Sequence, residues 1–166
     1  MQNHLDKILE TYRDEIAGEA FFHELARTSS EPEHAAKWRT LARLEQLVAD
    51  RLRTALETHA VRMPTVAKDQ RRGLESAQEY TGLTWHEALE RLRPELKGYV
   101  RDFQATESEM PKALLPLAQF VSAHERALLE FVTRELDQDG HRSLDGVLTL
   151  LGKTTPVAVV RRLIPD

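Results

Sequence analysis

Glutamate and histidine side chains recur on apolar stretches of this sequence, where a packed interior would usually place leucine. Glu19 and His23 lie four residues apart, which is about 6 Å along a helix and one turn on a single face. Glu45, His124 and Glu125 lie within other stretches rich in leucine and valine. An unpaired buried carboxylate is so unfavourable that it becomes protonated, binds a cation or points elsewhere. The residues that we consider as metal ligands are Glu19, His23, Glu45, Glu95, His124 and Glu125.

Carboxylates and imidazoles on facing helices are the ligands with which helix bundles hold two iron or manganese ions. That site takes one Glu from each of two helices and a Glu-x-x-His motif from each of the other two. Carboxylate oxygens suit the ferric state, and imidazoles suit iron while leaving open positions for dioxygen. The residue types therefore predict a site for one or two ions of iron or manganese.

Some of these residues also have an explanation that needs no metal. Glu19 can pair with Arg43 or with His23, and an inward-facing His124 can donate to a carboxylate. A shift of one residue in the helix register would place Glu125 in solvent. The sequence alone leaves a protein without any cofactor as the alternative.

The composition excludes several classes of protein. The 166 residues include no cysteine, which rules out disulfide scaffolds, thiolate zinc sites and iron–sulfur clusters held by thiolates. A net charge of −4 argues against a dedicated nucleic-acid partner. The longest apolar runs are about four residues, far short of the roughly 18 needed to span a bilayer. Because the N-terminus also lacks the pattern of a signal peptide, we expect a cytoplasmic protein without a membrane partner.

Apolar residues recur every three to four positions along most of the chain, which predicts helices rather than strands. One long connection lies between two expected helix hairpins, which differs from the short loops of simple up-down-up-down bundles. The fold class is therefore all-α, a four-helix bundle with a short C-terminal helix. The expected elements are a hairpin over residues 3–59, a crossover over 60–83 with a short helix near 69–80, a hairpin over 84–138 and a C-terminal cap over 143–166, together one domain of residues 1–166.

Helix ends and proline positions give further expectations. Residues 30–33 and 84–87 both have the spacing of a capping box, in which a hydroxyl and a glutamate satisfy each other's backbone N–H groups. Pro94 should kink or divide the third long helix, and Pro116 should bend the first turns of the fourth. An apolar tail over residues 157–164 should cover one end of the bundle.

The two hairpins resemble each other at a constant offset of 80 residues. The offset pairs Gly18 with Gly98 and residues 45–56 with residues 125–136. Because glycine inside a helix costs roughly 1 kcal/mol relative to alanine, the matched glycines predict a close helix approach at both positions. The repeat predicts a pseudo-twofold relation between the hairpins.

The first hairpin resembles a known family in its motifs. AGE at residues 17–19 and LARLE at residues 41–45 are similar to the first hairpin of rubrerythrins and related ferritin-like proteins, and HER at residues 124–126 resembles their fourth helix. The resemblance covers residues 5–58 and, more weakly, 94–137. It implies a ferritin-like four-helix bundle, a carboxylate-bridged iron or manganese centre that reacts with oxygen or peroxide, and a homodimer. In the family, the Glu of the first motif and the Glu of Glu-x-x-His bind metal.

The sequence departs from that ligand pattern on both hairpins. Val48 and Leu128 stand where the two Glu-x-x-His motifs require histidine, and Tyr99 lies opposite Glu19 at the 80-residue offset. We therefore expect an altered site, with Glu45 and Glu125 flanking the metal. Glu19 and either His124 or His23 would be terminal ligands, and Glu15 and Glu95 lie near enough in sequence to contribute.

Three functions follow from the sequence. The first is a ferritin-like metal protein with peroxide- or oxygen-dependent redox chemistry, which would need an external electron donor because the chain has no cysteine for a rubredoxin-like iron centre. The second is a metal-free ferritin-like scaffold that serves as a binding or dimerisation module. The third is a small-ligand pocket lined by Trp38, Tyr99 and Phe103.

Overall fold

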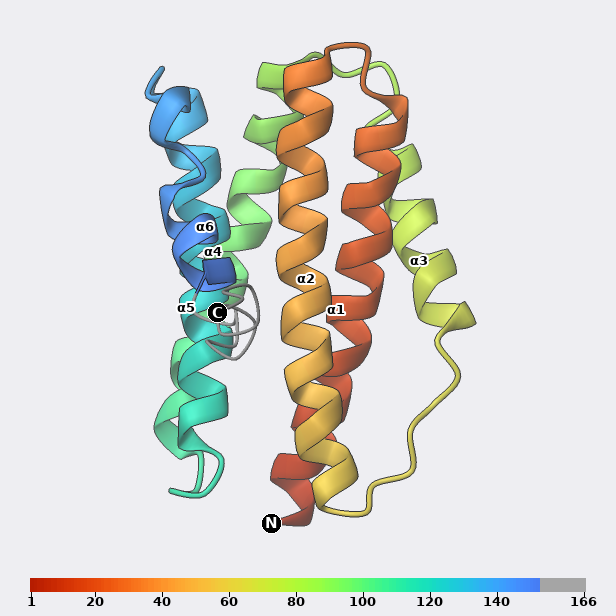
Figure 1. Cartoon of the computed structure of the whole chain (residues 1–166), viewed down its shortest axis with the longest axis vertical. Helices are drawn as coiled ribbons and strands as arrows, with labels where there is room; N and C mark the ends of the chain where they lie inside the picture. The colour runs from red at the N-terminus through yellow and green to blue at the C-terminus, as the bar shows by residue number, and fades with distance from the viewer. Residues whose placement is uncertain (153–166) are drawn as a thin grey trace, which may run out of the picture.

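The computed structural model describes residues 1–152, and these contain six α-helices, one short 3-10 helix and no strand (Figure 1). The prediction of an all-α fold is thus confirmed, whereas the predicted tail at residues 157–164 lies outside the described residues. None of the helices in residues 1–152 combines the length and apolarity that crossing a bilayer requires. The helices are α1 Gln2–Thr28, α2 Pro32–Thr58, α3 Ala67–Gln78, α4 Trp85–Glu109, α5 Leu115–Leu136 and α6 Asp145–Gly152, with the 3-10 turn η1 at Gly140–Arg142.

The four longest helices lie side by side along the long axis of the molecule (Figure 1). Helix α2 returns antiparallel to α1, and α3 then takes the chain back along α1, so that α2 and α4 begin at the same end. Helix α1 packs on α2 and α3, α4 packs on α5, and α2 contacts both α5 and α6. The two hairpins therefore meet mainly where α2 faces α5.

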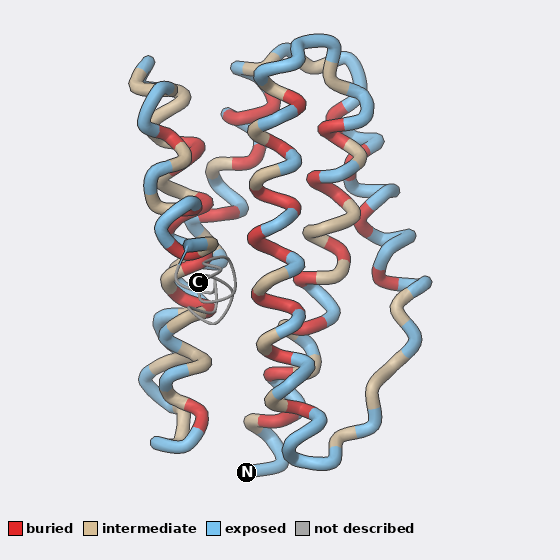
Figure 2. The backbone as a smooth tube through the Cα atoms, viewed as in Figure 1, coloured by how far each residue is buried: buried red, intermediate tan, exposed pale blue. Residues whose placement is uncertain are grey.

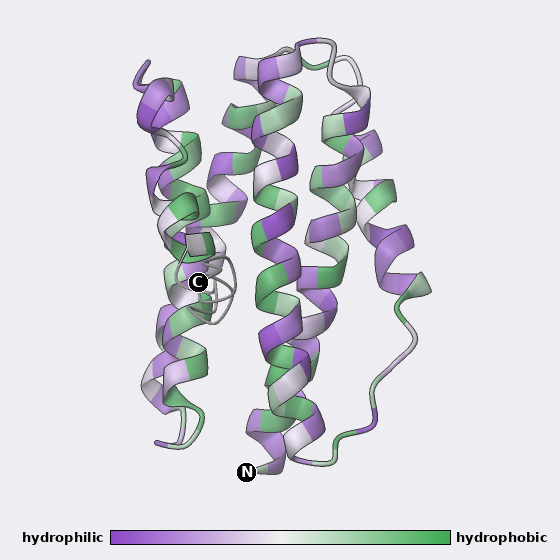
Figure 3. Cartoon of the chain, viewed as in Figure 1, coloured by the Kyte–Doolittle hydropathy of each residue, from purple (hydrophilic) through white to green (hydrophobic). Residues whose placement is uncertain are grey.

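Two apolar clusters fill the interior. Along the length of the helices, a layer of polar residues lies between these clusters. One cluster takes the C-terminal half of α1 and the N-terminal half of α2, and includes Trp38 and Phe131. The other takes the opposite halves of these helices and includes Ile8 and Leu52. Buried positions follow the inner face of each helix in Figure 2, and hydrophobic and hydrophilic residues alternate along each helix in Figure 3. Burial of these faces is the main term that holds the helices together.

The helix ends confirm one predicted cap and correct the other. The Thr84 backbone N–H donates to Glu87 Oε2 over 2.8 Å, and the Glu87 N–H donates to Thr84 Oγ1 over 3.3 Å, which completes a capping box. The capping box expected at Ser30 is wrong, because α2 begins at Pro32 with Glu31 as its N-cap and without a side-chain cap bond. Proline fits the first position of α2 because that N–H has no partner within the helix.

Neither Pro94 nor Pro116 interrupts its helix. Helix α4 runs through Pro94 without interruption, so the predicted division of this helix is wrong. Pro116 lies in the first turn of α5, where its missing N–H removes no helical hydrogen bond.

The glycines of the repeat have different surroundings. A Cβ atom on Gly18 would lie 2.5 Å from Glu45 Oε2, so the absence of a side chain makes room for a carboxylate. A Cβ atom on Gly98 would have no neighbour nearer than 3.9 Å, so the close approach predicted there is wrong. The close approach of two backbones occurs instead at Gly73, where a Cβ atom would lie 2.1 Å from the Ala17 carbonyl oxygen.

Candidate metal centre

Glu15, Glu45 and His124 converge in the interior from three different helices. Each of the three is buried, and each offers one ligand atom such that these atoms all lie within 4.8 Å of one another. His124 Nε2 lies 3.0 Å from Glu45 Oε1 and 3.6 Å from Glu15 Oε2. Such a group is the only one of its kind in the part of the chain that the structure describes, and it could hold a metal ion.

The helical pattern of α1, α2 and α5 explains why these side chains meet. Glu15 follows Ile8 and Tyr12 on the buried stripe of α1 and precedes Phe22, so it falls between the two apolar clusters. Glu45 holds the same place on α2 and His124 on α5. The three positions are therefore at one level of the molecule, with an apolar layer on each side of them along the helices.

A fourth ionisable side chain, Glu125, lies beside this group. Its Oε1 is 3.9 Å from His124 Nδ1, and the side chain is 7% exposed. Glu15 Oε2 and Glu125 Oε2 are both buried without a hydrogen-bond partner. Nearly all buried polar atoms in proteins are satisfied, and an exception often marks the place of an ion or ligand.

Burial and mutual repulsion shift the titration of the acidic members of the site. Burial, together with the neighbouring Glu45 carboxylate, raises the pKa of Glu15 well above its usual range. Burial raises the pKa of Glu125 to about 7, and the nearby Glu45 contributes, although His124 opposes the shift. For His124, burial lowers the pKa, but the carboxylates of Glu45 and Glu125 outweigh it and the net shift is upward. A bound proton or a bound cation would therefore stabilise this group of side chains.

The spacing of the three ligand atoms suits a first-row metal. Metal–oxygen and metal–imidazole bonds are about 2.0–2.2 Å long, so neighbouring ligand atoms in an octahedral or tetrahedral site lie about 3.0–3.5 Å apart. The two distances from His124 Nε2, 3.0 and 3.6 Å, are close to that range. Two carboxylates and one imidazole suit iron, manganese or zinc, and no thiolate is available to select a soft ion.

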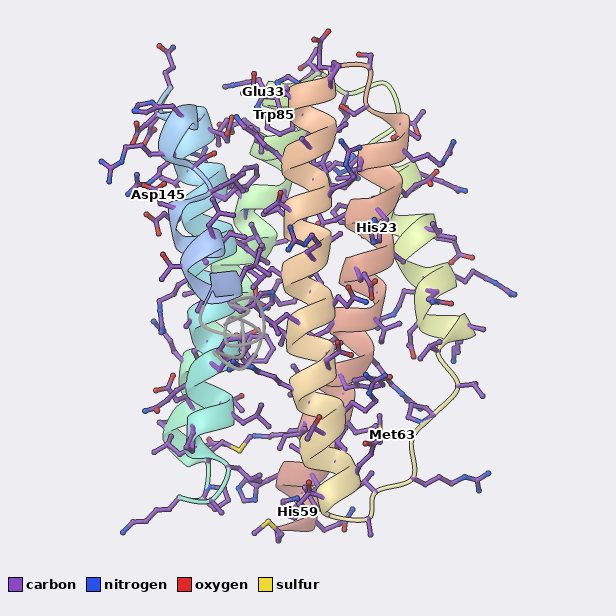
Figure 4. All side chains as sticks on the ribbon, viewed as in Figure 1. His23, Glu33, His59, Met63, Trp85 and Asp145 are labelled. Atoms are coloured by element: carbon purple, nitrogen blue, oxygen red, sulfur yellow. The ribbon has the colours of Figure 1, made fainter. Side chains whose placement is uncertain are left out.

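The structure distributes the predicted ligands between the interior and the surface. Glu45, His124 and Glu125 lie at the buried group. Glu19 lies one turn beyond it, with its side chain 26% exposed and its Oε1 3.7 Å from His23 Nε2. His23, marked on α1 in Figure 4, has a half-exposed side chain. Neither residue is part of the group, and on α1 that place is taken by Glu15.

The other residues that were considered from the sequence lie outside the buried group. Glu95 lies on α4, exposed on the wall of a cleft, and is not among the grouped ligands. Val48 and Leu128 are buried in the apolar clusters, and Tyr99 is 47% exposed. The signal that could have singled out Glu15 is its spacing, because it shares the three-to-four residue stripe of Ile8 and Tyr12.

An open cleft of about 500 Å³ reaches this group from the surface. Residues of all five helices α1 to α5 line it, including Glu15, Glu45 and Glu125. Of the residues expected around a ligand pocket, Tyr99 and Phe103 line the cleft. Trp38 does not line it, because its ring stacks on Phe22 in the core with ring centroids 5.7 Å apart, and this part of the prediction is wrong.

Comparisons of the chain with protein-family models, with curated proteins and with solved structures find no match.

Proposed function

We propose that this chain is a ferritin-like four-helix bundle protein that binds iron or manganese through Glu15, Glu45 and His124. Its activity would be peroxide- or oxygen-dependent oxidation. The observation that carries the proposal is the buried convergence of these three side chains within 4.8 Å, with one Glu15 oxygen left without a hydrogen-bond partner. Burying several carboxylates without a cation is strongly unfavourable, and a divalent ion at this place would relieve that cost.

The donor set argues against calcium, magnesium and a structural zinc site. Calcium and magnesium prefer oxygen ligands alone, whereas His124 offers a nitrogen within 3.0 Å of a Glu45 oxygen. Structural zinc sites are usually closed by four ligands rich in cysteine or histidine, and this chain has no cysteine. Three protein ligands would leave positions open for an oxidant that enters through the cleft.

The protein's own residues would hold the ion and manage protons. The ion, when bound, would supply an open coordination position and a one-electron redox couple. Glu15 would have to lose its proton on binding, and His124 would have to be neutral at Nε2, so binding releases protons. Glu125, with a pKa of about 7, can hold or release a proton at Oε2 on the cleft side of the site.

The proposal also includes a homodimer and an external electron donor. Both follow from the resemblance to the rubrerythrin group and from the absence of cysteine for a second iron centre. The donor would be needed to return the metal to its reduced state after each oxidation.

A metal-free scaffold is the second candidate, and one contact favours it. His124 Nε2 lies 3.0 Å from Glu45 Oε1, a hydrogen bond that becomes an ion pair if the ring is protonated and Glu45 is ionised, while Glu15 is neutral. The raised pKa values of His124 and Glu15 agree with that protonation pattern. In that case the layer would be a buried ion pair that fixes how α2 and α5 pack, and the protein would act as a helical binding or dimerisation module.

Metal analysis of paired variants separates the two candidates. The protein is loaded with Fe²⁺ or Mn²⁺ without oxygen, desalted and measured by elemental analysis, with Zn²⁺ and Mg²⁺ run alongside. We expect about one Fe or Mn ion per chain in the wild type and in Glu19→Gln, and a loss of at least tenfold in affinity in Glu45→Gln. Glu45→Gln keeps the shape of the side chain, so folding can be verified by circular dichroism.

Two results would overturn the metal proposal. One is that no ion is retained by the correctly folded wild type, which leaves the scaffold. The other is that Glu19→Gln loses metal as completely as Glu45→Gln, which would move the site away from Glu15.

A further inference from the structure

The cleft beside the buried group has the size of a small-molecule site. Its volume of about 500 Å³ lies within the roughly 300–1,000 Å³ that is usual for small ligands. Helices α1 and α3 form one wall and α4 forms another, while Glu45 and Glu125 lie at its inner end. It exists because α1 packs on α2 and α3, whereas α4 packs on α5.

The lining of the cleft has more acidic than basic side chains. Eight carboxyl groups line it and only two cationic side chains do so. Both cations already have partners: Arg72 lies 2.8 Å from Asp14, and Lys7 lies 3.0 Å from Glu109. A concave surface of one charge sign attracts ligands of the opposite sign.

Three buried polar atoms on the cleft lining have no hydrogen-bond partner. They are Glu15 Oε2, Glu125 Oε2 and the hydroxyl of Tyr80. The metal proposal uses Glu15 as a ligand, whereas it binds no ligand atom of Glu125 or Tyr80. The carboxylate oxygen of Glu125 and the phenol of Tyr80, which can also accept, suit a ligand with several N–H donors on one positive centre.

The remaining lining is apolar and aromatic. Phe21, Leu92, Leu96 and Leu128 are buried side chains that face the cleft. Tyr99 adds an accessible aromatic ring one turn after Glu95 on α4. Apolar walls bind a hydrocarbon body, and an aromatic face also attracts a cation.

We propose that this cleft binds a small primary amine in its ammonium form, with an apolar body. The nitrogen lies toward Glu125 and the Glu95–Tyr99 side of α4, where its N–H groups meet carboxylate oxygens. The body lies against Phe21, Leu92 and Leu96. This inference goes beyond the proposed metal chemistry and needs no metal, since neither Glu95 nor Glu125 belongs to the group of Glu15, Glu45 and His124.

The test compares ligands that share a skeleton and differ in charge. Benzylamine, butylamine and 2-phenylethylamine are each titrated by calorimetry into the full chain, and so are the corresponding alcohols and the benzoate anion. We expect at least one amine to bind about tenfold or more tightly than its alcohol, and benzoate not to bind. Equal affinity for amine and alcohol in all pairs would mean an unspecific apolar hollow and would overturn the proposal, as would no binding of any amine.

Variants locate the ammonium group. Glu125→Gln should weaken amine binding about tenfold, and the more exposed Glu95→Gln about threefold. Glu90→Gln is the matched control, because Glu90 is exposed on α4, pairs with Arg93 at 2.9 Å and does not line the cleft. Amine affinity that is unchanged in both Glu125→Gln and Glu95→Gln would overturn the assignment.

Metal content provides the independent readout. Elemental analysis of Glu95→Gln should equal that of the wild type even when amine binding is weakened. If the wild type binds amine but retains no metal, the metal proposal fails alone. If it retains metal and binds no amine, the cleft assignment fails alone.

Discussion

Glu15, Glu45, His124 and Glu125 occupy a buried layer between two apolar clusters, and burial there raises the pKa of Glu15 and of Glu125. Each carboxylate that loses its proton makes the loss of the next one more unfavourable, because little water is present to screen the charges. One cation bound at this place would instead favour the ionised form of each carboxylate. The residues therefore make protonation and metal binding competing reactions at one site.

This competition predicts how the stability of the metal-free protein depends on pH. Glu125 ionises near pH 7 when folded and near 4.5 when free, so the unfolded chain loses its proton first and stability falls as the pH rises between these values. The raised pKa of His124 acts in the same direction, because its contribution is complete below about 6.5 and is lost as the pH rises through the folded value. We expect the free energy of unfolding of metal-free protein to decrease from pH 5 to pH 8, with Glu125 contributing at most about 3 kcal/mol.

Urea denaturation of chelator-treated protein at several pH values measures this effect. Glu125→Gln is the control, since it removes the carboxyl group and should make the fall in stability between pH 5 and 7 less steep. Stability that rises over this range would contradict the direction of the shifts.

At the scale of the helices, Gly18 and Gly98 offer a matched pair of substitutions. Alanine favours a helix over glycine by roughly 1 kcal/mol, so Gly98→Ala, which has open space around its Cβ, should stabilise the protein by up to that amount without affecting metal binding. Gly18→Ala places a methyl group 2.5 Å from Glu45 Oε2, and the flexible carboxylate must move. We expect Gly18→Ala to fold with little change in stability but to bind metal several-fold more weakly.

Thermal denaturation and metal titration of both variants check this pair. Equal metal affinity in the two variants would mean that the position of the Glu45 carboxylate does not depend on the space that Gly18 leaves.

Gly73 is the position where α3 comes closest to α1. A Cβ atom there would lie 2.1 Å from the Ala17 carbonyl oxygen, and a backbone atom cannot turn aside as a side chain can. Gly73→Ala should therefore push α3 away from α1 and lower the free energy of unfolding by about 2 kcal/mol or more. Urea denaturation measures the change, and proteolysis within residues 60–83 should become faster. A Gly73→Ala variant as stable as the wild type would contradict this prediction, because it would show that α3 can move away from α1 without loss of stability.

At the scale of the whole molecule, the proposed metal joins the two hairpins. Glu15 and Glu45 belong to the hairpin of α1 and α2, whereas His124 belongs to that of α4 and α5. The hairpins otherwise meet mainly where α2 contacts α5 and α6. A ligand that bridges them should strengthen the cooperativity of the entire fold.

We therefore expect metal to protect helices far from the site. At a free metal concentration about one hundred times the dissociation constant, the free energy of unfolding should rise by about 2.7 kcal/mol. Hydrogen exchange should slow in α5 as well as in α1 and α2, while the exposed α3 changes less. Protection confined to one hairpin would argue that the ion does not bridge them, and Glu45→Gln serves as the control.

Local sequence determined the helices and much of their order. The three-to-four residue spacing of apolar side chains identifies the elements because each helix must bury one face, whatever its neighbours are. The Thr84 cap was predictable because all its hydrogen bonds lie within four residues. The same reasoning identified Glu45 and His124 as buried polar residues that need a partner.

Tertiary packing alone decided which side chains meet. Glu15 and Glu19 are one turn apart on nearly the same face of α1, and only the placement of α2 and α5 brings Glu15 to the site and leaves Glu19 partly exposed. Sequence spacing fixes the direction in which a side chain points around the axis of its own helix. It does not fix the position along that axis at which the residues of another helix pack. The contact at Gly73 and the cleft beside α4 depend on the same relative heights and rotations, which no single segment encodes.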